Sequence, residues 1–116
     1  DVRELESLRG QLRAFAAARD WAQFHSPKNL AMALSVETGE LLEIFQWLTE
    51  AQSRSLPHDA QAAASDEIAD VLLYLIQLSD QLGIDPVAAA ERKLLANGER
   101  YPVEQARGNS RKSPGR

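Results

Sequence analysis

The chain has 116 residues, of which 44% are hydrophobic and 26% charged, and it contains no cysteine. This length favours a single domain, and the lack of cysteine excludes disulfides and thiolate metal sites, which leaves oxygen and histidine as metal ligands. The total formal charge is −4, but residues 105–116 carry four basic side chains and no acid, so residues 1–104 carry a formal charge of −8. A surface of this charge is unsuited to nucleic-acid binding.

The sequence predicts neither a membrane span nor a signal region, and it predicts a disordered C-terminal tail. No stretch is apolar and long enough to predict a membrane span, and the first residues, Asp1-Val-Arg-Glu-Leu, do not form an apolar signal region. We therefore expect a cytoplasmic protein with no membrane partner. Residues 1–104 are expected to form one helical domain, and residues 105–116, which lack apolar anchors, a basic disordered tail.

The apolar spacing predicts an all-α protein, a bundle of four helices with short connecting segments. The first helix is expected over residues 4–19, where leucines and Phe15 recur along one side. A second helix is expected to start with Ser26 as N-cap and Pro27 at its first position, and to run to about Glu50.

The second half of the chain continues the helical pattern. After a polar loop at 51–58, Asp59 is expected to cap a third helix that stops at Gly83. Asp85-Pro86 opens a short fourth helix that ends near Asn97-Gly98. Because the loop is short, we expect the second and third helices to lie antiparallel.

Two pairs of acids interrupt the apolar faces of these two helices. Glu37 lies within the apolar stripe of the second helix, and Glu40 lies on the adjoining row. Glu67 and Asp70 repeat the arrangement on the third helix, and no basic residue stands four positions after any of the four acids. Residues three apart project from nearly one face of a helix, so the antiparallel helices are expected to bring all four carboxylates together.

Four convergent carboxylates repel one another unless a cation or protons compensate their charge. Oxygen ligands favour Mg²⁺ or Mn²⁺ over zinc, and both ions suit phosphate chemistry. The alternative is that these acids border solvent, as acidic pairs three residues apart on a helix usually do. Tyr74 and Gln77 lie on the same face as Asp70 and are candidates to support the ligands.

The pattern Glu37-x-x-Glu40, followed after 26 residues by Glu67-x-x-Asp70, resembles that of the all-α nucleoside triphosphate pyrophosphohydrolases, the MazG-like superfamily. The resemblance covers residues 12–107, although Val36 departs from the common double-glutamate start of the motif. Further segments look like the dCTP pyrophosphatase branch: Arg19-Asp-Trp-Ala-Gln-Phe-His, Phe45-Gln-Trp47, Lys93 and Asn97-x-x-Arg100-Tyr-Pro.

The resemblance implies a Mg²⁺-dependent reaction in which a nucleoside triphosphate and water give the monophosphate and pyrophosphate. It implies removal of dCTP or modified dCTP from the nucleotide pool, by a homotetramer built as a dimer of dimers. The resemblance further implies that the four acids hold the metal ions, and we expect one glutamate, for which Glu40 is favoured, to take the proton of the attacking water.

Eight further residues are candidates for substrate binding. The resemblance places Trp21, His25 and Trp47 around the base, although core packing also explains Trp47. Lys28, Lys93 and Arg100 are candidates for phosphate contacts, with solvated charges as the alternative. Asn97 is either a helix C-cap or a substrate contact, and Tyr101 follows Arg100 in the motif.

Two rival interpretations remain. The same chemistry can act on another nucleotide, such as dUTP or an oxidised deoxynucleotide. A different class of protein also fits the pattern, a non-catalytic helical module that oligomerises and whose acids bind structural cations or a basic partner.

Overall fold

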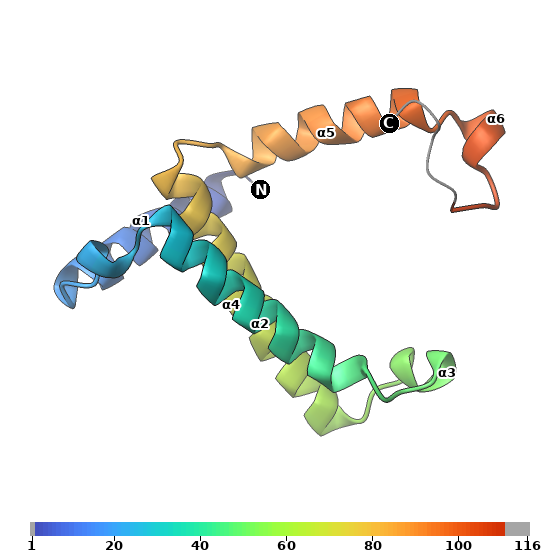
Figure 1. Ribbon diagram of the computed structural model, residues 1–116, viewed down its shortest axis with the longest axis horizontal. Helices are drawn as coiled ribbons and strands as arrows, with labels where there is room; N and C mark the ends of the chain where they lie inside the picture. Colours follow the sequence, from blue (N-terminus) through green and yellow to red (C-terminus); the bar gives the residue numbers. More distant parts are fainter. Residues whose placement is uncertain (1, 111–116) are drawn as a thin grey trace. The chain divides into compact units, whose positions relative to one another are not determined.

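Between Val2 and Ser110, the part of the chain that the computed structural model describes, every regular element is helical (Figure 1). The elements are α1 (Val2–Ala18), the short 3₁₀ helix η1 (Ala22–Phe24), α2 (Pro27–Phe45), α3 (Glu50–Ser53), α4 (His58–Gln81), α5 (Pro86–Arg100) and α6 (Val103–Ala106). The all-α prediction is confirmed. This part of the chain holds six α-helices rather than four, because α3 and α6 add one turn each.

The predicted basic tail falls only partly within the described range. Residues 103–106 form α6, and the tail residues Arg111 to Arg116 lie outside the described residues. Among the helices described here, none has both the length and the apolar content needed to cross a bilayer.

The start of α2 agrees with the prediction, but its end does not. The Ser26 hydroxyl accepts the backbone N–H of Asn29 at 3.1 Å, with Pro27 at the first helical position. The helix stops at Phe45, not at Glu50 as expected. A separate helix, α3, begins at Glu50. It is capped by Thr49, because the Thr49 hydroxyl accepts the backbone N–H of Gln52 and the Gln52 side chain accepts the backbone N–H of Thr49, which is a complete capping box.

The ends of α4 and α5 differ from the prediction by a few residues. α4 begins directly after Pro57, so Asp59 lies in its first turn rather than at its cap. It ends before Gly83, whose φ of +66° suits a residue without a side chain. Asp85 caps α5 as expected, but this helix continues to Arg100 and therefore passes through Asn97, which is not its C-cap.

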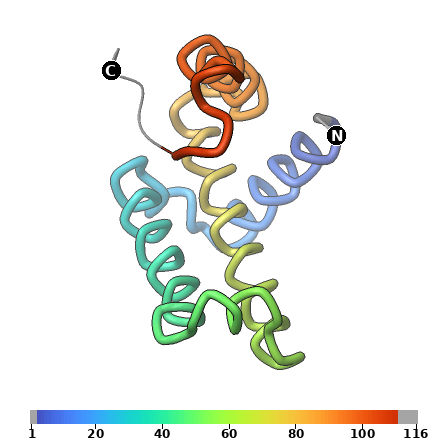
Figure 2. Tube along the Cα trace, turned by 90° about the vertical axis from the view of Figure 1, so that its right-hand side faces the viewer, coloured from blue at the N-terminus to red at the C-terminus, as the bar shows by residue number. Residues whose placement is uncertain are grey.

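The chain forms two units, Asp1–Gly83 and Ile84–Arg116, which are described separately. In the first unit α4 lies between α1 and α2, and α2 and α4 run side by side (Figures 1 and 2). Its core is small, and the apolar side chains that are buried in it are those of Ala16, Leu30, Ala64 and Ile76. The position of α4 places its acids against α2.

An ion pair joins α1 to α4 across 67 residues of sequence. Arg13 Nε donates to Asp80 Oδ2 at 2.8 Å, and Arg13 Nη2 donates to Asp80 Oδ1. Such two-point guanidinium–carboxylate contacts fix orientation as well as distance. The pair therefore holds the C-terminal part of α1 against the C-terminal end of α4.

Asp80→Asn is expected to destabilise the protein by about 1 kcal/mol at neutral pH, because a neutral amide loses the charge-assisted bonds to Arg13. The bonds from Arg13 lower the pKa of Asp80 below its ordinary value of 3.8. A carboxyl whose pKa is lower in the folded state stabilises the protein above its unfolded pKa, and this stabilisation is lost as the pH falls through the folded pKa. The difference in Tm between variant and wild type should therefore shrink below about pH 4.

The control for this measurement is Asp66→Asn, which changes an exposed acid of the same helix and should leave the Tm unchanged. A Tm difference at Asp80 that stays constant down to strongly acidic pH would contradict the ion-pair explanation.

Candidate functional site

Three of the four predicted carboxylates meet between α2 and α4. Glu37 comes from α2, Glu67 and Asp70 come from α4, and one carboxylate oxygen of each lies within 4.8 Å of the other two. Glu67 and Asp70 project together because they are three residues apart on one helix, and the neighbouring α2 supplies the third acid. All three side chains are half-buried.

The charge of this three-carboxylate cluster is not neutralised by basic side chains. Among the residues that the structure describes, no lysine or arginine pairs with it, and Glu37 Oε2 and Glu67 Oε2 are buried without a hydrogen-bond partner. An ionised carboxylate oxygen is only an acceptor, so two of them can bond each other only by sharing a proton. The contact with Glu67, followed by burial, accordingly raises the pKa of Glu37 above its ordinary value of 4.5.

Glu40 lies one turn along α2 from Glu37 and stands beside the cluster without belonging to it. Its side chain is half-buried. The close side-chain contact with Glu37, followed by the charge of that residue, raises the pKa of Glu40 above its ordinary value. A carboxyl whose pKa is shifted towards neutrality is a suitable acceptor for a proton.

The cluster fits a hard divalent cation. Its ligands are all carboxylate oxygens, two of those oxygens have no other partner, and they come from rigid helices. Hard cations such as Mg²⁺ and Mn²⁺ prefer this donor set, and a cation would replace the shared proton. Glu37, Glu67 and Asp70 can therefore hold a metal ion, and Glu40 lies one helical turn from Glu37.

The two tryptophans are not brought together in one chain. Trp21 precedes η1 at the N-terminal end of α2, and its ring meets the edge of Phe15 with the centroids 5.7 Å apart. Trp47 follows the other end of α2 and is 87% exposed, so core packing does not explain it. The 19 residues of α2 separate the two by roughly 28 Å.

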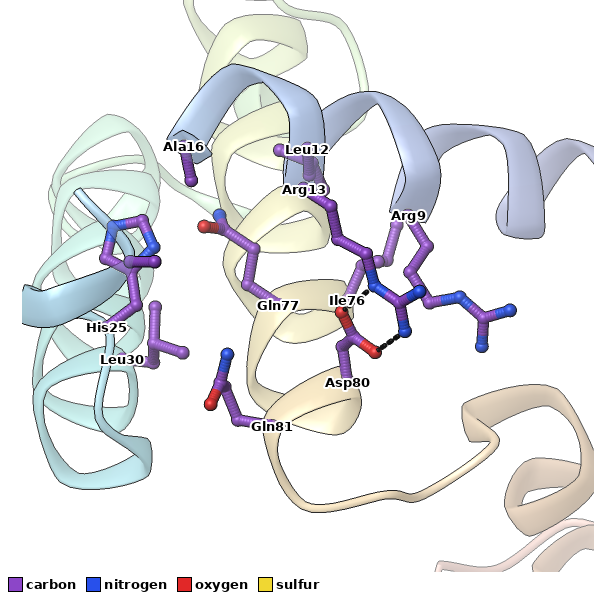
Figure 3. Close-up of a pocket in the computed structure, with 11 residues that line it drawn as sticks. Arg9, Leu12, Arg13, Ala16, His25, Leu30, Ile76, Gln77, Asp80 and Gln81 are labelled. Atoms are coloured by element: carbon purple, nitrogen blue, oxygen red, sulfur yellow. Dashed lines mark hydrogen bonds and ion pairs between the residues drawn. The ribbon is translucent and has the colours of Figure 1, made fainter. Parts of the chain in front are cut away.

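A small cavity of about 150 Å³ lies at the N-terminal end of α2 (Figure 3). His25, predicted from the sequence, lines it, and so does Gln77. The other lining residues were not singled out as site residues by the sequence patterns: Arg9, Leu12, Arg13, Ala16, Ala22, Leu30, Ile76, Asp80 and Gln81. Leu30 precedes Glu37 by seven residues and Gln77 follows Asp70 by seven, which is about two helical turns in each case.

The remaining candidates for substrate binding occupy other parts of the chain. Lys28 is exposed in the first turn of α2. Lys93 and Asn97 lie on α5 in the second unit, Arg100 is its last residue, and Tyr101 follows. Arg100 Nε and Nη2 are buried and have no acceptor among the residues described, while its guanidinium lies 5.1 Å from the Tyr101 ring.

Comparison with known proteins gives concordant matches. The profile of the MazG-like family matches residues 32–114. dCTP pyrophosphatase 1 of Mus musculus is 44% identical over 108 residues, and that of Homo sapiens is 43% identical over 110 residues. The matches cover 91% and 93% of this chain, but the chain spans only 64% and 65% of the length of these two relatives.

Among solved structures, the crystal structure of a pyrophosphatase from Archaeoglobus fulgidus superposes with a TM-score of 0.81 at 41% sequence identity. The match covers 85% of this chain and 93% of that one. The structure comparison and the sequence comparison therefore both match this chain to pyrophosphatases.

Proposed function

The chain belongs to the MazG-like family, and from this premise we propose that it is a divalent-metal-dependent nucleoside triphosphate pyrophosphohydrolase acting on dCTP. The predicted membership of this family is thereby confirmed. The observation that carries the proposal is the cluster of Glu37, Glu67 and Asp70, whose buried oxygens lack partners and whose chemistry suits a cation. The dCTP pyrophosphatases of mouse and human, at 44% and 43% identity, support dCTP as the substrate.

Glu37, Glu67 and Asp70 would hold Mg²⁺ or Mn²⁺, with Glu40 available as a further ligand. When bound, such an ion neutralises phosphate oxygens, makes the α-phosphorus more electrophilic and lowers the pKa of a water. Glu40, one turn along α2 from Glu37, would take the proton of the attacking water. The water oxygen bonds to the α-phosphorus, the bond from this phosphorus to the bridging oxygen breaks, and dCMP and pyrophosphate result.

Substrate contacts are proposed for the remaining candidates. Arg100 has the strongest support, since two buried guanidinium nitrogens without an acceptor suit a phosphate. Lys28, Lys93, Asn97 and Tyr101 are proposed on the resemblance alone. Trp21 and His25 are proposed for the base. Trp47, whose large exposed ring suits stacking, is proposed for the base of a substrate bound to a neighbouring subunit, because the length of α2 separates it from Trp21.

We propose a homotetramer, and exposed apolar stripes on the first unit support it. Ile68, Leu72 and Leu75 recur along α4 with 56%, 40% and 42% exposure, and Met32 and Val36 recur along α2 with 57% and 58%. Apolar surface of this kind usually marks a protein interface. Light scattering of the protein in solution measures its molecular mass, which is expected to be that of four chains.

The function is tested by a panel of dCTP, dUTP, dTTP, dATP and dGTP with Mg²⁺. We expect pyrophosphate and dCMP from dCTP, little orthophosphate, and a rate that a chelator abolishes and added Mg²⁺ restores. The measurement separates pyrophosphate from orthophosphate by chromatography. Release of orthophosphate alone, or no release from any of the five nucleotides by folded protein, would overturn the proposal.

A further inference from the structure

The chain turns sharply at Asp20, between α1 and η1. With a φ of +54°, Asp20 is the one non-glycine residue in the described part of the chain whose backbone is left-handed. A residue with a Cβ adopts this conformation at a cost in free energy that glycine avoids. An aspartate at position 20 therefore has a cause other than backbone conformation, for which glycine is the better residue.

The turn is a Schellman motif, a hydrogen-bonded way of ending a helix. The backbone N–H of Asp20 donates to the oxygen of Ala17 at 3.2 Å, and that of Trp21 donates to the oxygen of Ala16 at 2.9 Å. These are the two bonds that define the motif, and Asp20 stands where glycine is usually found. The motif therefore holds Trp21 directly against the end of α1.

The Trp21 ring packs on the last turns of α1. It contacts the Phe15 ring with the centroids 5.7 Å apart and the two planes inclined by 67°, a favourable arrangement for two aromatic rings. The Arg19 guanidinium carbon lies 3.6 Å from the centroid of the same Phe15 ring, and Arg19 Nη1 donates to the Phe15 backbone oxygen at 3.1 Å. Trp21 is still 45% exposed within the single chain, so part of its surface is open to a ligand.

The side chain of Asp20 makes a contact that glycine cannot make. Gln23 Nε2 donates to the backbone oxygen of Asp20 at 3.0 Å and to its Oδ2 at 3.1 Å. Gln23 belongs to η1, and the far end of η1 is tied to α2, because Asn29 Nδ2 donates to the backbone oxygen of Phe24 at 3.0 Å. The contact between Asp20 and Gln23 therefore fixes η1 to the end of α1.

We propose that Asp20 is a positioning residue for Trp21. Its left-handed backbone turns the chain, and its carboxylate holds the turn through Gln23, so that the Trp21 ring keeps one orientation before the substrate arrives. A side chain that is already ordered loses less conformational entropy on binding. The inference rests on the proposed function, in which Trp21 contacts the base. Asp20 acts through Trp21 and takes no part in the chemical step.

The test compares Asp20→Gly and Asp20→Asn with the wild type. Glycine accepts the left-handed backbone but removes the carboxylate, whereas asparagine tolerates this backbone and keeps an oxygen that can accept from Gln23. We expect Asp20→Gly to keep a Tm close to that of the wild type, because the more favourable backbone offsets the lost hydrogen bond. Its KM for dCTP should rise about fivefold while kcat changes less than about twofold.

Asp20→Asn is expected to keep the KM within about twofold of the wild type. A residue that only ended the helix would give the opposite order, since glycine is the better residue for that purpose. A normal KM in Asp20→Gly, or an equal rise of KM in Asp20→Asn, would therefore overturn the inference while the proposed function stands.

The partner in the contact provides a second variant. Gln23→Met removes the donor and should raise the KM as Asp20→Gly does, and the double variant should be no worse than either single one, because both remove the same contact. Gln11→Met is the matched control, since Gln11 is an exposed glutamine of α1 that donates to Ser7 Oγ at 3.1 Å, and it should leave the KM unchanged. Losses that multiply in the double variant would contradict the proposed contact.

A spectroscopic measurement tests the orientation of Trp21 without any reaction. The chain has two tryptophans, so Trp21 is the only one left in a Trp47→Phe background. A tryptophan gives a near-ultraviolet circular dichroism band when its surroundings are fixed. Without metal or nucleotide, Asp20→Gly in this background should lose at least about half of the band, and Asp20→Asn should retain it.

The band separates failure of this inference from failure of the proposed function. Its loss in Asp20→Gly supports the positioning of Trp21 even if the protein hydrolyses no nucleotide. An unchanged band in Asp20→Gly, or a band already absent when Asp20 is intact, counts against the inference whether or not dCTP is the substrate.

Discussion

Asp70→Asn is expected to lower the rate of pyrophosphate release from dCTP by roughly a thousandfold, the equivalent of about 4 kcal/mol in the activation free energy. The substitution preserves the shape of the side chain but removes one of the three negative charges that the cluster offers to a cation. Since a metal ion is proposed to neutralise the triphosphate and activate the water, loss of its ligand affects the transition state more than substrate binding. The initial rate of pyrophosphate release at saturating Mg²⁺ measures the effect.

A stability measurement distinguishes this explanation from simple unfolding. The charge of Asp70 is one of the causes that raise the pKa of Glu37, so the metal-free cluster is repulsive. Asp70→Asn should therefore leave the Tm of the metal-free protein equal or higher. Asp66→Asn removes an exposed charge from the same helix and should retain full activity. An inactive Asp70→Asn protein with a lowered Tm, or one that keeps a tenth of the rate, would contradict the proposed role.

Leu30→Ala is expected to cost about 3 kcal/mol of stability, the largest effect on folding that we predict for one side chain. Leu30 is 1% exposed and is the largest side chain in the described core that is fully buried. The core has few other buried apolar residues to compensate for the lost contacts, and the substitution would enlarge the cavity beside α4. Urea denaturation followed by circular dichroism measures the change.

The matched control is Leu42→Ala on the same helix, where the side chain is 59% exposed. This variant should lose less than about 1 kcal/mol. Similar losses at both positions would mean that burial of Leu30 in the single chain does not determine its contribution, and that Leu42 is covered in an assembly.

The acidic pairs could be predicted from the sequence because their signal is local. Glu37 interrupts an apolar stripe, and the three-residue spacing of Glu67 and Asp70 places both on one face of any helix. The antiparallel contact of α2 and α4 then followed from a short connection. The short helix α3 between them was not predicted. Its capping box, formed by Thr49 and Gln52, lies inside a stretch whose apolar spacing alone favours one continuous helix.

The cavity could not be predicted in this way, because its residues come from α1, η1, α2 and α4 and no local pattern joins them. Arg13 and Asp80 are 67 residues apart, and their pairing depends on how α1 crosses α4. The exposure of Trp47 also depends on tertiary structure, since the same residue continues an apolar row in the sequence but lies beyond the end of α2 in the fold.

The equal spacing of cavity and cluster on the two helices has a consequence for how this segment can change during evolution. Between Leu30 and Glu37 several side chains are exposed, including those of Met32 and Val36, so substitutions there leave the positions of both sites intact. A single inserted or deleted residue would instead rotate one site by about 100° around the helix relative to the other. Within the single chain the exposed positions of residues 31–36 can therefore vary in sequence, whereas the length of this segment is constrained.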